Sequence, residues 1–440
     1  MSEQGIRNAR SLGAPKMALL GFQHMFAMFG ATVLVPVLTG LPVAATLLFA
    51  GLGTLLFHFL TKWEVPAFLG SSFAFLGGYA SVAALFNNTE AINWIPYAGV
   101  GVACAGIMYA ILSALFKSFG AQRVMRFFPP IVTGPVIICI GLCLANSAIN
   151  NCEANWWIAI LSIAIVVVCN IWGKGMIKII PILLGVVGSY LVAAIFGQVD
   201  FSGVASAKWI GFPVQFENTV FSLFKGCDGG KLVSAIVIMV PIAIATMIEH
   251  IGDVCAISST VGQNFVADPG LHRTLLGDGM ATTLAALFGA PANTTYGENT
   301  GVLALTKVYD PAVIRIAAGL AIFFSFCPKF AALVSAMPTA TIGGVSLILY
   351  GMISAVGVRN VVENQVDFTK SRNIIIAALI LGLSLGINFS SAGAVVLGPV
   401  SLSGLAVGAL VGILLNAILP GNDYEFGKDL QGDISVNFKV

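Results

Sequence analysis

The sequence predicts an all-α, polytopic membrane protein with fourteen transmembrane segments, arranged as a seven-plus-seven inverted repeat with two broken strand and half-helix segments. Its composition, the distribution of its basic residues and a repeated motif support this prediction. Of the 440 residues, 58% are hydrophobic and only 9% are charged, compared with roughly 25% charged residues in an average soluble domain. Such scarce charged side chains cannot cover a soluble globule of this size, so we expect a helical bundle embedded in a bilayer.

The apolar runs set the number of segments, because a membrane-spanning helix needs about 20 predominantly apolar residues. Runs of this kind lie at 17–38, 42–60, 96–116, 128–147, 155–173, 177–197, 232–257, 313–334, 338–357, 372–390 and 400–419. Three further segments, at 66–86, 274–290 and 291–308, are apolar but interrupted by Gly, Ser, Thr, Asn or Pro. Together these runs give fourteen passes, although the interrupted segments could be half-spans.

The Lys and Arg residues test this count, because basic residues collect in cytoplasmic loops. With fourteen passes and a cytoplasmic N-terminus, seventeen of the 21 fall on the cytoplasmic side. The other four are Lys208, Lys225, Lys231 and Lys329. Three of these lie in the long polar loop 199–231, which we place outside the cell. We therefore expect a multi-pass protein of the cell inner (cytoplasmic) membrane with both termini, 1–16 and 421–440, in the cytoplasm.

The long loop divides the chain into two halves, 17–198 and 232–420. Two motifs occur once in each half, and they pair Gln23-His24 with Glu249-His250 and Gly70–Phe75 with Asn293–Glu298. The two offsets, 226 and 223 residues, are nearly equal. Because each half has seven passes, the second half must enter the membrane from the opposite side. The result is an inverted repeat, which is an architecture of transporters.

Ionisable residues are rare in the predicted spans, where a charged side chain at the bilayer centre costs about 2.5–3.5 kcal/mol on insertion scales. The residues in mid-span are His24, Glu249, His250, Asp253 and Glu298, with His58 nearer a helix end. Four of the first five belong to the repeated motifs, and this coincidence indicates a functional site. His24 or His250 could instead be a packed core residue, and Asp253 could face a solvated vestibule.

Two segments, 68–78 and 289–301, are rich in Gly, Ser, Thr, Asn and aromatic residues and should form helices poorly. Such pieces suit a strand that turns into a half-helix. Irregular backbone at membrane depth is tolerated only where protein or a cavity covers it. We therefore expect the two segments to meet near the midplane, to pair as a short two-stranded ribbon and to aim backbone N–H groups at a cavity between them.

This cavity would combine backbone donors with the carboxylates of Glu249 and Glu298 and the aromatic faces of Phe73 and Tyr296. Such a combination suits a small, flat, polar ligand whose ring stacks on an aromatic side chain. An inorganic anion would need basic side chains, which are missing from these segments. A sugar would need many hydroxyl partners, and nothing in the sequence singles one out.

The spacing of two carboxylates suggests a proton site. Glu249 and Asp253 lie four residues apart, so on a helix they share one face. Two carboxylates close together in a low dielectric cannot both stay ionised cheaply, and one of them should hold a proton. Our hypothesis is that Glu249 binds ligand and proton together, modulated by Asp253 or His24.

Other classes of function have little support in the sequence. It contains no Ser/His/Asp grouping, no cluster of metal ligands and no nucleotide-binding loop. We therefore expect neither an enzyme nor a cofactor or a metal site. No basic cluster suggests a nucleic-acid partner, and the partners we expect are a small ligand, a proton and the lipid bilayer.

The segment Glu298–Lys307 carries a family signature. It has an acidic residue followed by Asn, any residue, Gly, four residues of any kind, Thr and Lys. With this signature, and with Gln23–Pro36, Pro66–Phe75 and Asp268–Arg273, the chain resembles the nucleobase–ascorbate transporters over nearly its whole length. Within that family it is most similar to the bacterial uracil permeases, since xanthine and urate carriers have Gln at the first signature position.

The resemblance implies uptake of uracil or a related pyrimidine by proton symport, with alternating access between a core domain (segments 1–4 and 8–11) and a gate domain (segments 5–7 and 12–14). It also implies that Glu249 and Glu298 hold the base together with the backbone amides of Phe73 and Gly297. Further positions that match the pocket are Tyr296, Ala31 and Tyr350. Family members often form dimers through the gate domain, so a homodimer is a further expectation.

One position departs from the family pattern. Uracil permeases carry a histidine where this sequence has Asp253, and they tie proton coupling to that histidine. Asp253 could take the protonatable role, or coupling could rest on Glu249 alone. Two alternatives stay open, a xanthine or purine carrier of the same family and an anion transporter of the same fold. The acidic side chain of Glu298 counts against the anion transporter.

Overall fold

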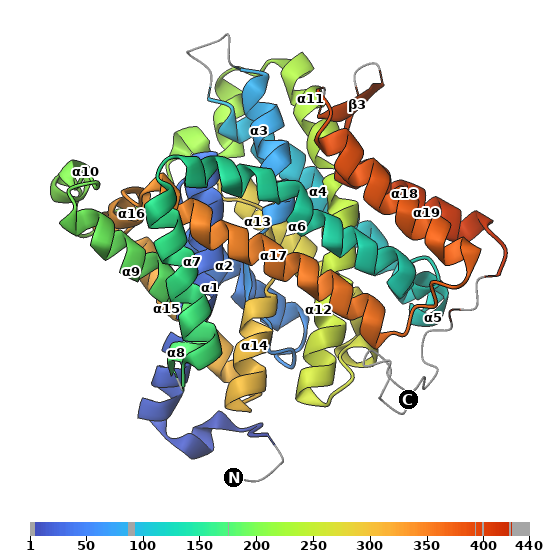
Figure 1. The fold of residues 1–440 in the computed structure, drawn as a ribbon, viewed down its shortest axis with the longest axis horizontal. Coiled ribbons are helices and arrows are strands. Elements are labelled where there is room, and N and C mark those ends of the chain that lie inside the picture. The colour runs from blue at the N-terminus through green and yellow to red at the C-terminus, as the bar shows by residue number, and fades with distance from the viewer. Residues whose placement is uncertain are drawn as a thin grey trace.

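The protein is a bundle of long helices, with strands confined to two short pairs (Figure 1). The computed structural model describes residues 5–86, 93–174, 176–391, 393–397, 400–421 and 424, without the side chains at positions 30, 31, 176, 179, 298, 305, 396, 397, 400 and 401. Within this part of the chain, seven helices are long and apolar enough to cross a membrane, or up to eight if a bent pair is counted as one span. The remaining expected passes correspond to shorter apolar helices, to the helix Leu271–Leu287 and to the two broken segments.

The helices of the first half follow the predicted apolar runs closely. They are α1 (Ala14–Thr39), α2 (Val43–Leu60), α3 (Leu76–Ala84), α4 (Ile95–Phe119), α6 (Pro130–Glu153), α7 (Trp156–Trp172) and α9 (Pro181–Ile195). Shorter helical turns connect them, namely η1 (Ala9–Leu12), η2 (Phe73–Phe75), α5 (Ala121–Met125) and α8 (Met176–Ile179). Proline stands at the first or second position of α1, α4, α6 and α9, where its missing N–H costs nothing.

The second half repeats this order after the long loop, which holds α10 (Ser202–Ser206), η3 (Phe216–Asn218) and η4 (Val220–Lys225). Its helices are α11 (Gly229–Met239), α12 (Ile242–Val261), α13 (Leu271–Leu287), α14 (Gly297–Thr306), α15 (Pro311–Ser325), α16 (Pro328–Ser335), α17 (Thr339–Glu363), α18 (Ser371–Asn388) and α19 (Gly404–Ile418). A π-helical turn, η5 (Val266–Gly270), precedes α13.

The predicted two-stranded ribbon is present. Strand β1 (Leu69–Ser71) pairs antiparallel with β2 (Asn293–Thr295), with Leu69 opposite Thr295 and Ser71 opposite Asn293. Every residue of both strands is buried. The backbone N–H of Tyr296 donates to the carbonyl of Phe68 at 3.0 Å, which extends the pairing by one residue. The ribbon therefore satisfies its own backbone groups inside the protein, as irregular structure at membrane depth requires.

Neighbouring helices hold the ribbon through polar side chains. Thr54 of α2 accepts a hydrogen bond from the N–H of Leu69 at 2.9 Å. Thr282 of α13 donates to the carbonyl of Asn293 at 2.7 Å, and the Asn293 amide donates to the carbonyl of Phe49 in α2 at 2.9 Å. Both strands are therefore fixed to α2 and α13, the helices beside them.

Helix packing separates two groups of helices. Helix α17 lies along α6 and also packs on α7, while α18 packs on α19 and α6 (Figure 1). In the other group, α13 packs on α4 and α2, and α15 packs on α2 and α1. Helix α12 contacts members of both groups, among them α6, α13 and α14. This central position makes α12 the element that any site between the two groups would share.

Several predicted spans differ from the structure. The run 232–257 is divided between α11 and α12 by a turn at Val240 and Pro241. The run 313–334 is not one helix, because α15 ends at Ser325 and α16 continues at 90° to it from Pro328. The run 400–419 begins as strand β4 (Val400–Ser403), which pairs with β3 (Ala394–Leu397), and only then becomes α19. The segment 274–290 was expected to be interrupted, yet it is mostly the continuous helix α13. Pro328 explains the bend between α15 and α16, since proline cannot donate the N–H that would continue α15.

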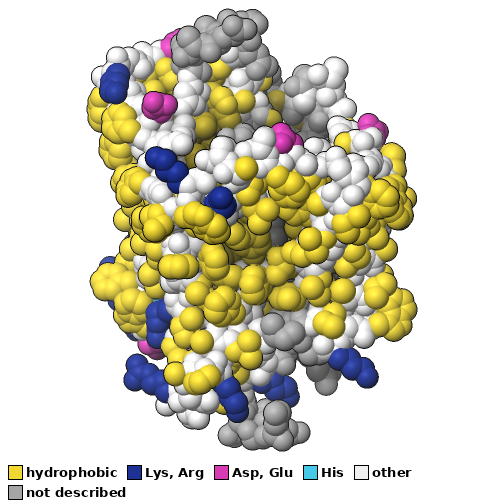
Figure 2. Space-filling view, turned by 90° about the vertical axis from the view of Figure 1, so that its left-hand side faces the viewer, with side chains coloured by type: hydrophobic (Ala, Val, Ile, Leu, Met, Phe, Trp, Pro, Cys, Tyr) yellow, Lys and Arg dark blue, Asp and Glu magenta, His cyan; other side chains and the backbone are white. Residues whose placement is uncertain are grey.

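The surface fits a bilayer. Figure 2 shows hydrophobic side chains over a broad middle band of one face, with the charged side chains visible there mainly toward the two ends. Large apolar side chains that are exposed include those of Trp157, Ile171, Ile195, Phe323 and Ile418. Lipid tails would cover such a band, whereas in water it would be an aggregation surface. Its chemistry is that of a multi-pass membrane protein.

The close approach of the ribbon to α1 and to Tyr296 yields a stability prediction. A Cβ at Gly70 would lie 2.6 Å from the Tyr296 ring and 2.7 Å from Thr32 Oγ1. We expect Gly70→Ala to destabilise the protein by about 1–3 kcal/mol, the usual cost of overpacking, and to lower its melting temperature in detergent. Gly77→Ala is the matched control, because nothing lies within 4 Å of a Cβ there. Equal melting temperatures for the two variants would contradict this packing argument.

Candidate functional site

A cavity of about 330 Å³ lies where α12 and the second broken segment face α6 and α17. Its volume is near the lower end of the range for small-molecule sites, about 300–1,000 Å³. At one end it reaches Phe73 and Tyr296 beside the ribbon. At the other it reaches Arg359 and Glu363 near the end of α17. The cavity therefore runs from the ribbon toward the side of the molecule where the predicted cytoplasmic loop after α17 begins.

The polar wall of the cavity comes from α12 and the second broken segment. Glu249 and Asp253 lie one turn apart on α12, and both line the cavity. The hydroxyl of Thr295 donates to Asp253 Oδ2 at 2.7 Å. Gly297 lies opposite, where a Cβ would be 4.0 Å from Asp253 Oδ1. Two carboxylates thus meet the start of α14 inside one small cavity.

The broken segment also presents hydrogen-bonding groups to the cavity. Helix α14 begins at Gly297, and the first N–H groups of a helix have no partner within that helix. The hydroxyls of Thr294 and Thr300 line the cavity, and within the described residues neither has a hydrogen-bond partner. Acceptors on α12 and donors on β2 and α14 therefore face the same space, which suits a ligand with both kinds of group.

Aromatic rings close the cavity at the ribbon. Phe73 and Tyr350 lie edge to face, with ring centroids 5.6 Å apart. Tyr296 is held in place by its hydroxyl, which donates to the carbonyl of Ser71 at 2.8 Å and lies 3.3 Å from Thr32 Oγ1. The hydroxyl of Tyr296 therefore cross-links the two broken segments, and Tyr296 also lines the cavity.

Most of the predicted site residues come together at this cavity. Phe73, Glu249, Asp253, Tyr296 and Gly297 line it, and Tyr350 packs on Phe73. The side chains of Ala31 and Glu298 are outside the described part of the structure, so they are not placed relative to the cavity. The binding roles of all these residues stay predictions.

His24 is placed differently from the other predicted residues. It does not line the cavity and is fully buried in α1. The Asn299 amide lies 3.1 Å from His24 Nδ1 and donates to the His24 carbonyl at 3.1 Å. His24 thus supports the residue next to Glu298, and a part in proton coupling stays a prediction.

Sequence reasoning missed two parts of the site. The wall opposite α12 comes from α6 and α17, through side chains such as Thr133, Ile137, Leu349 and Met352. These residues carry no charge or motif that would mark them. Thr295 was noted within the repeated motif but not as a donor to Asp253. Its position in a short strand beside α12 becomes visible only in the fold.

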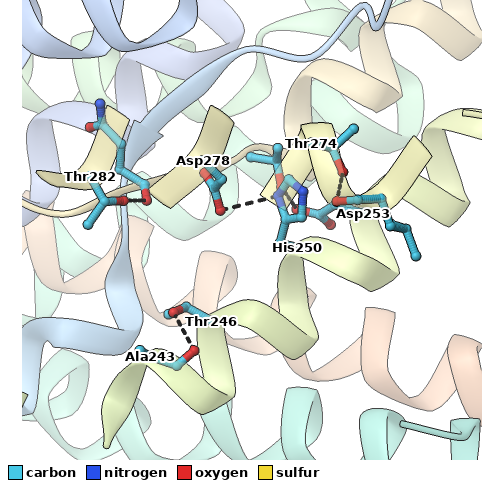
Figure 3. A network of polar contacts seen from close by, with 10 residues as sticks. Ala243, Thr246, His250, Asp253, Thr274, Asp278 and Thr282 are labelled. Carbon is cyan, nitrogen blue, oxygen red and sulfur yellow. Dashed lines mark hydrogen bonds and ion pairs between the residues drawn. The ribbon is translucent and has the colours of Figure 1, made fainter. Parts of the chain in front are cut away.

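A buried carboxylate was also missed. Asp278 of α13 is fully buried, and its Oδ2 lies 3.2 Å from His250 Nδ1 on α12. In Figure 3 the His250 ring lies between Asp278 and Asp253. The signal in the sequence was the charged residue of Gly277-Asp278-Gly279, inside a segment predicted to cross the membrane. His250 therefore has an ionisable partner, Asp278, which the sequence did not predict.

The sequence of the chain matches a known protein family. The model of the Permease family matches residues 15–393. The chain belongs to this family. The match spans both broken segments and confirms the resemblance to nucleobase–ascorbate transporters. The protein is therefore a multi-pass membrane protein of a permease family.

Curated relatives match over nearly the full length. The uracil permease of Bacillus caldolyticus is 42% identical over 415 residues, covering 91% of this chain and 91% of that protein. The uracil permease of Bacillus subtilis strain 168 is 40% identical over 429 residues, covering 94% and 93%. The uracil permease of Escherichia coli K12 is 36% identical over 410 residues, covering 91% and 90%.

Solved structures support the fold. A structure of SLC26A9 matches with a TM-score of 0.65 at 13% identity, covering 93% of this chain and 66% of that one. The transmembrane domain of the cyanobacterial bicarbonate transporter BicA matches with a TM-score of 0.61 at 13% identity, covering 94% and 100%. At such low identity the likeness shows the fold alone, which is the predicted seven-plus-seven inverted repeat.

The cavity yields a labelling prediction. Cys255 on α12 lines it, whereas Cys139 on α6 is fully buried against α18. In variants that keep one cysteine and replace the other seven with alanine, a water-soluble methanethiosulfonate reagent should label Cys255 and leave Cys139 unmodified. Mass spectrometry of the intact protein measures the labelling. An unlabelled Cys255, or modification of Cys139 at the same rate as Cys255, would contradict this placement of the cavity.

Proposed function

We propose that the protein takes up uracil or a closely related pyrimidine across the cytoplasmic membrane by proton symport. The observation that carries the proposal is the meeting of Glu249 and Asp253 with the start of α14 in one small cavity beside an aromatic ring. The three relatives described above, each matching over at least nine-tenths of this chain, are uracil permeases. The cavity chemistry and the relatives lead to the same class of ligand.

A pyrimidine base suits the groups around the cavity. Its ring N–H groups would donate to Glu249 and, by the family resemblance, to Glu298. Its carbonyl oxygens would accept from the backbone N–H groups of Phe73 and Gly297, each at the start of a half-helix. The ring of Phe73 would provide an apolar face for the base. Each edge of the base would then have a partner.

The two packing groups of helices suit alternating access. We assign α1–α4 and α11–α16 to a core domain and α6–α9 and α17–α19 to a gate domain. The cavity lies between them, bounded by α12 and α14 on one side and by α6 and α17 on the other. Its long axis runs toward Arg359, on the side we take as cytoplasmic. This conformation would be inward-facing, and movement of the core against the gate would open the opposite side.

The carboxylates supply a place for the coupling proton. Glu249 and Asp253 share one face of α12 inside a cavity walled mainly by apolar side chains. Two negative charges there would repel each other strongly in the low dielectric, so one proton between them lowers the electrostatic energy. A proton that enters with the base would allow both carboxylates to face the ligand without two negative charges.

An anion transporter of the same fold is the second candidate, because BicA shares this fold. The charges of the cavity disfavour it. An anion would sit beside Glu249 and Asp253, and the described basic side chain that lines the cavity, Arg359, lies at its far end. Like-charge contacts of this kind cost several kcal/mol in the interior of a protein. A neutral base meets no such penalty.

Uptake of radiolabelled uracil by proteoliposomes tests the function. The parent protein should accumulate uracil, and Glu249→Gln should raise the half-saturating concentration about tenfold to a hundredfold. That range corresponds to the loss of one hydrogen bond to a charged group, about 1.5–3 kcal/mol. Glu153→Gln is the matched control, because this exposed glutamate ends α6 away from the cavity. Competition by unlabelled pyrimidines, purines and bicarbonate would then rank the ligands, and competition by bicarbonate alone would exclude a nucleobase carrier.

The dependence of uptake on external pH tests the coupling ion. The parent protein should take up more uracil as the external pH falls, because a proton must be bound with the base. Asp253→His should move the pH of half-maximal uptake, since imidazole titrates in a different range from a carboxyl group. The same uptake at every pH in both proteins, with retained transport, would show that protons are not the coupling ion.

A further inference from the structure

The fully buried pair of Asp278 and His250 lies outside the cavity, and no step of the proposed transport cycle uses it. Asp278 Oδ2 and His250 Nδ1 are 3.2 Å apart, and both side chains are completely shielded from solvent. The pair joins α13 to α12 behind the wall that carries Asp253 (Figure 3). A carboxylate buried at this depth is costly, so its retention calls for a physical reason.

A chain of contacts connects this pair to the cavity. Thr295 Oγ1 lies 3.5 Å from His250 Nδ1, and the same hydroxyl donates to Asp253 Oδ2 at 2.7 Å. The order of groups is therefore Asp278, His250, Thr295 and Asp253. The first two are sealed in the protein, and the last two line the cavity.

The contact distances suit an arrangement of hydrogens in which Asp278 is a carboxylate. A threonine hydroxyl has one hydrogen, and at 2.7 Å Thr295 uses it on Asp253. The contact from His250 Nδ1 to Thr295 then needs a hydrogen on the ring nitrogen. Asp278 Oδ2 lies 3.2 Å from the same nitrogen, so a negative charge on Asp278 favours a hydrogen on Nδ1. If Nδ1 lacked its hydrogen, Thr295 could turn toward it and leave Asp253.

We propose that Asp278 and His250 are positioning residues that keep the Thr295 hydroxyl directed at Asp253. Asp278 holds His250 as the tautomer protonated at Nδ1, and His250 thereby prevents Thr295 from donating away from the cavity. This role rests on the proposed function, because it matters only if Asp253 takes part in ligand or proton binding. The contact chain itself can be tested without a ligand.

Other charged and aromatic groups surround this chain of contacts. Glu249 lies on α12 one turn before Asp253, and Arg359 and Glu363 of α17 line the same cavity. Tyr109 of α4 lies beside Asp278. Phe57 of α2 packs edge to face with His250, and their ring centroids are 6.2 Å apart. Helix α14 contributes Glu298, whose side chain is outside the described structure. The hydroxyl of Thr295 is the group that connects the buried pair to the cavity wall.

The tautomer of His250 is the first measurement. The chain has four histidines, so ¹⁵N-histidine labelling in liposomes gives a solid-state spectrum in which His250→Gln assigns the His250 signals. The parent protein should show His250 protonated at Nδ1. Asp278→Ala should give a mixture of tautomers, whereas Asp278→Asn should keep the parent form because its side-chain oxygen still accepts. An unchanged His250 signal in Asp278→Ala would overturn the proposal.

Transport kinetics are the second measurement. Thr295→Val removes the hydroxyl and keeps the shape, and it should raise the half-saturating concentration of uracil roughly tenfold, as for a lost hydrogen bond to a charged group. Thr295→Ser should restore the parent value. Asp278→Ala should have a similar effect alone and move the pH profile of uptake in the same direction as Thr295→Val. Asp278→Ala combined with Thr295→Val should have no larger effect than Thr295→Val alone.

The two measurements separate failure of this inference from failure of the proposed function. If the parent protein accumulates no base, the function is wrong, and the His250 signal alone decides whether the contact chain exists. If it accumulates uracil but the two substitutions act independently, the inference is wrong and the function stands. Thermal unfolding of each variant identifies any that fail to fold. If Asp278→Ala is one of them, loss of the Nδ1-protonated form in Asp278→Asn would overturn the proposal instead.

Discussion

Backbone hydrogen bonding at membrane depth is the constraint on which this structure depends. Two segments leave the helical conformation inside the bundle, and each would expose unsatisfied backbone groups if it stood alone. Antiparallel pairing of β1 with β2 solves this, because each strand supplies the partners that the other lacks. The pairing needs one segment from each half of the inverted repeat, so the two halves can form the site only together.

The ribbon also determines what the site can contain. After its last paired residue each strand turns into a short helix, so two helix starts lie beside one cavity. Close approach requires a small residue at Gly70, and the cross-link from Tyr296 to Ser71 fixes the distance between the segments. The neighbouring helix α12 adds the carboxylates of Glu249 and Asp253 to the cavity wall.

The sequence revealed the ribbon because both broken motifs combine glycine and hydroxyl residues at equivalent places in the two halves. Glu249 and Asp253 were visible because charges are rare in apolar spans. The wall from α6 and α17 was not, because side chains such as Ile137 and Leu349 resemble any other lipid-facing or core residue. The pairing of Asp278 with His250 joins two helices, and no periodicity within one helix reports the rotation of another.

The departure from the family pattern at Asp253 has a physical context in these contacts. A carboxylate there receives a hydrogen from Thr295, and the nearest histidine stands three residues earlier, behind the cavity wall. If Asp253 takes up a proton, it becomes a weaker acceptor and loosens its hold on Thr295. Thr295 is two residues from Gly297, whose N–H is expected to meet the base. Proton binding and base binding would then act on the same short stretch of backbone, which gives coupling without a histidine in the cavity.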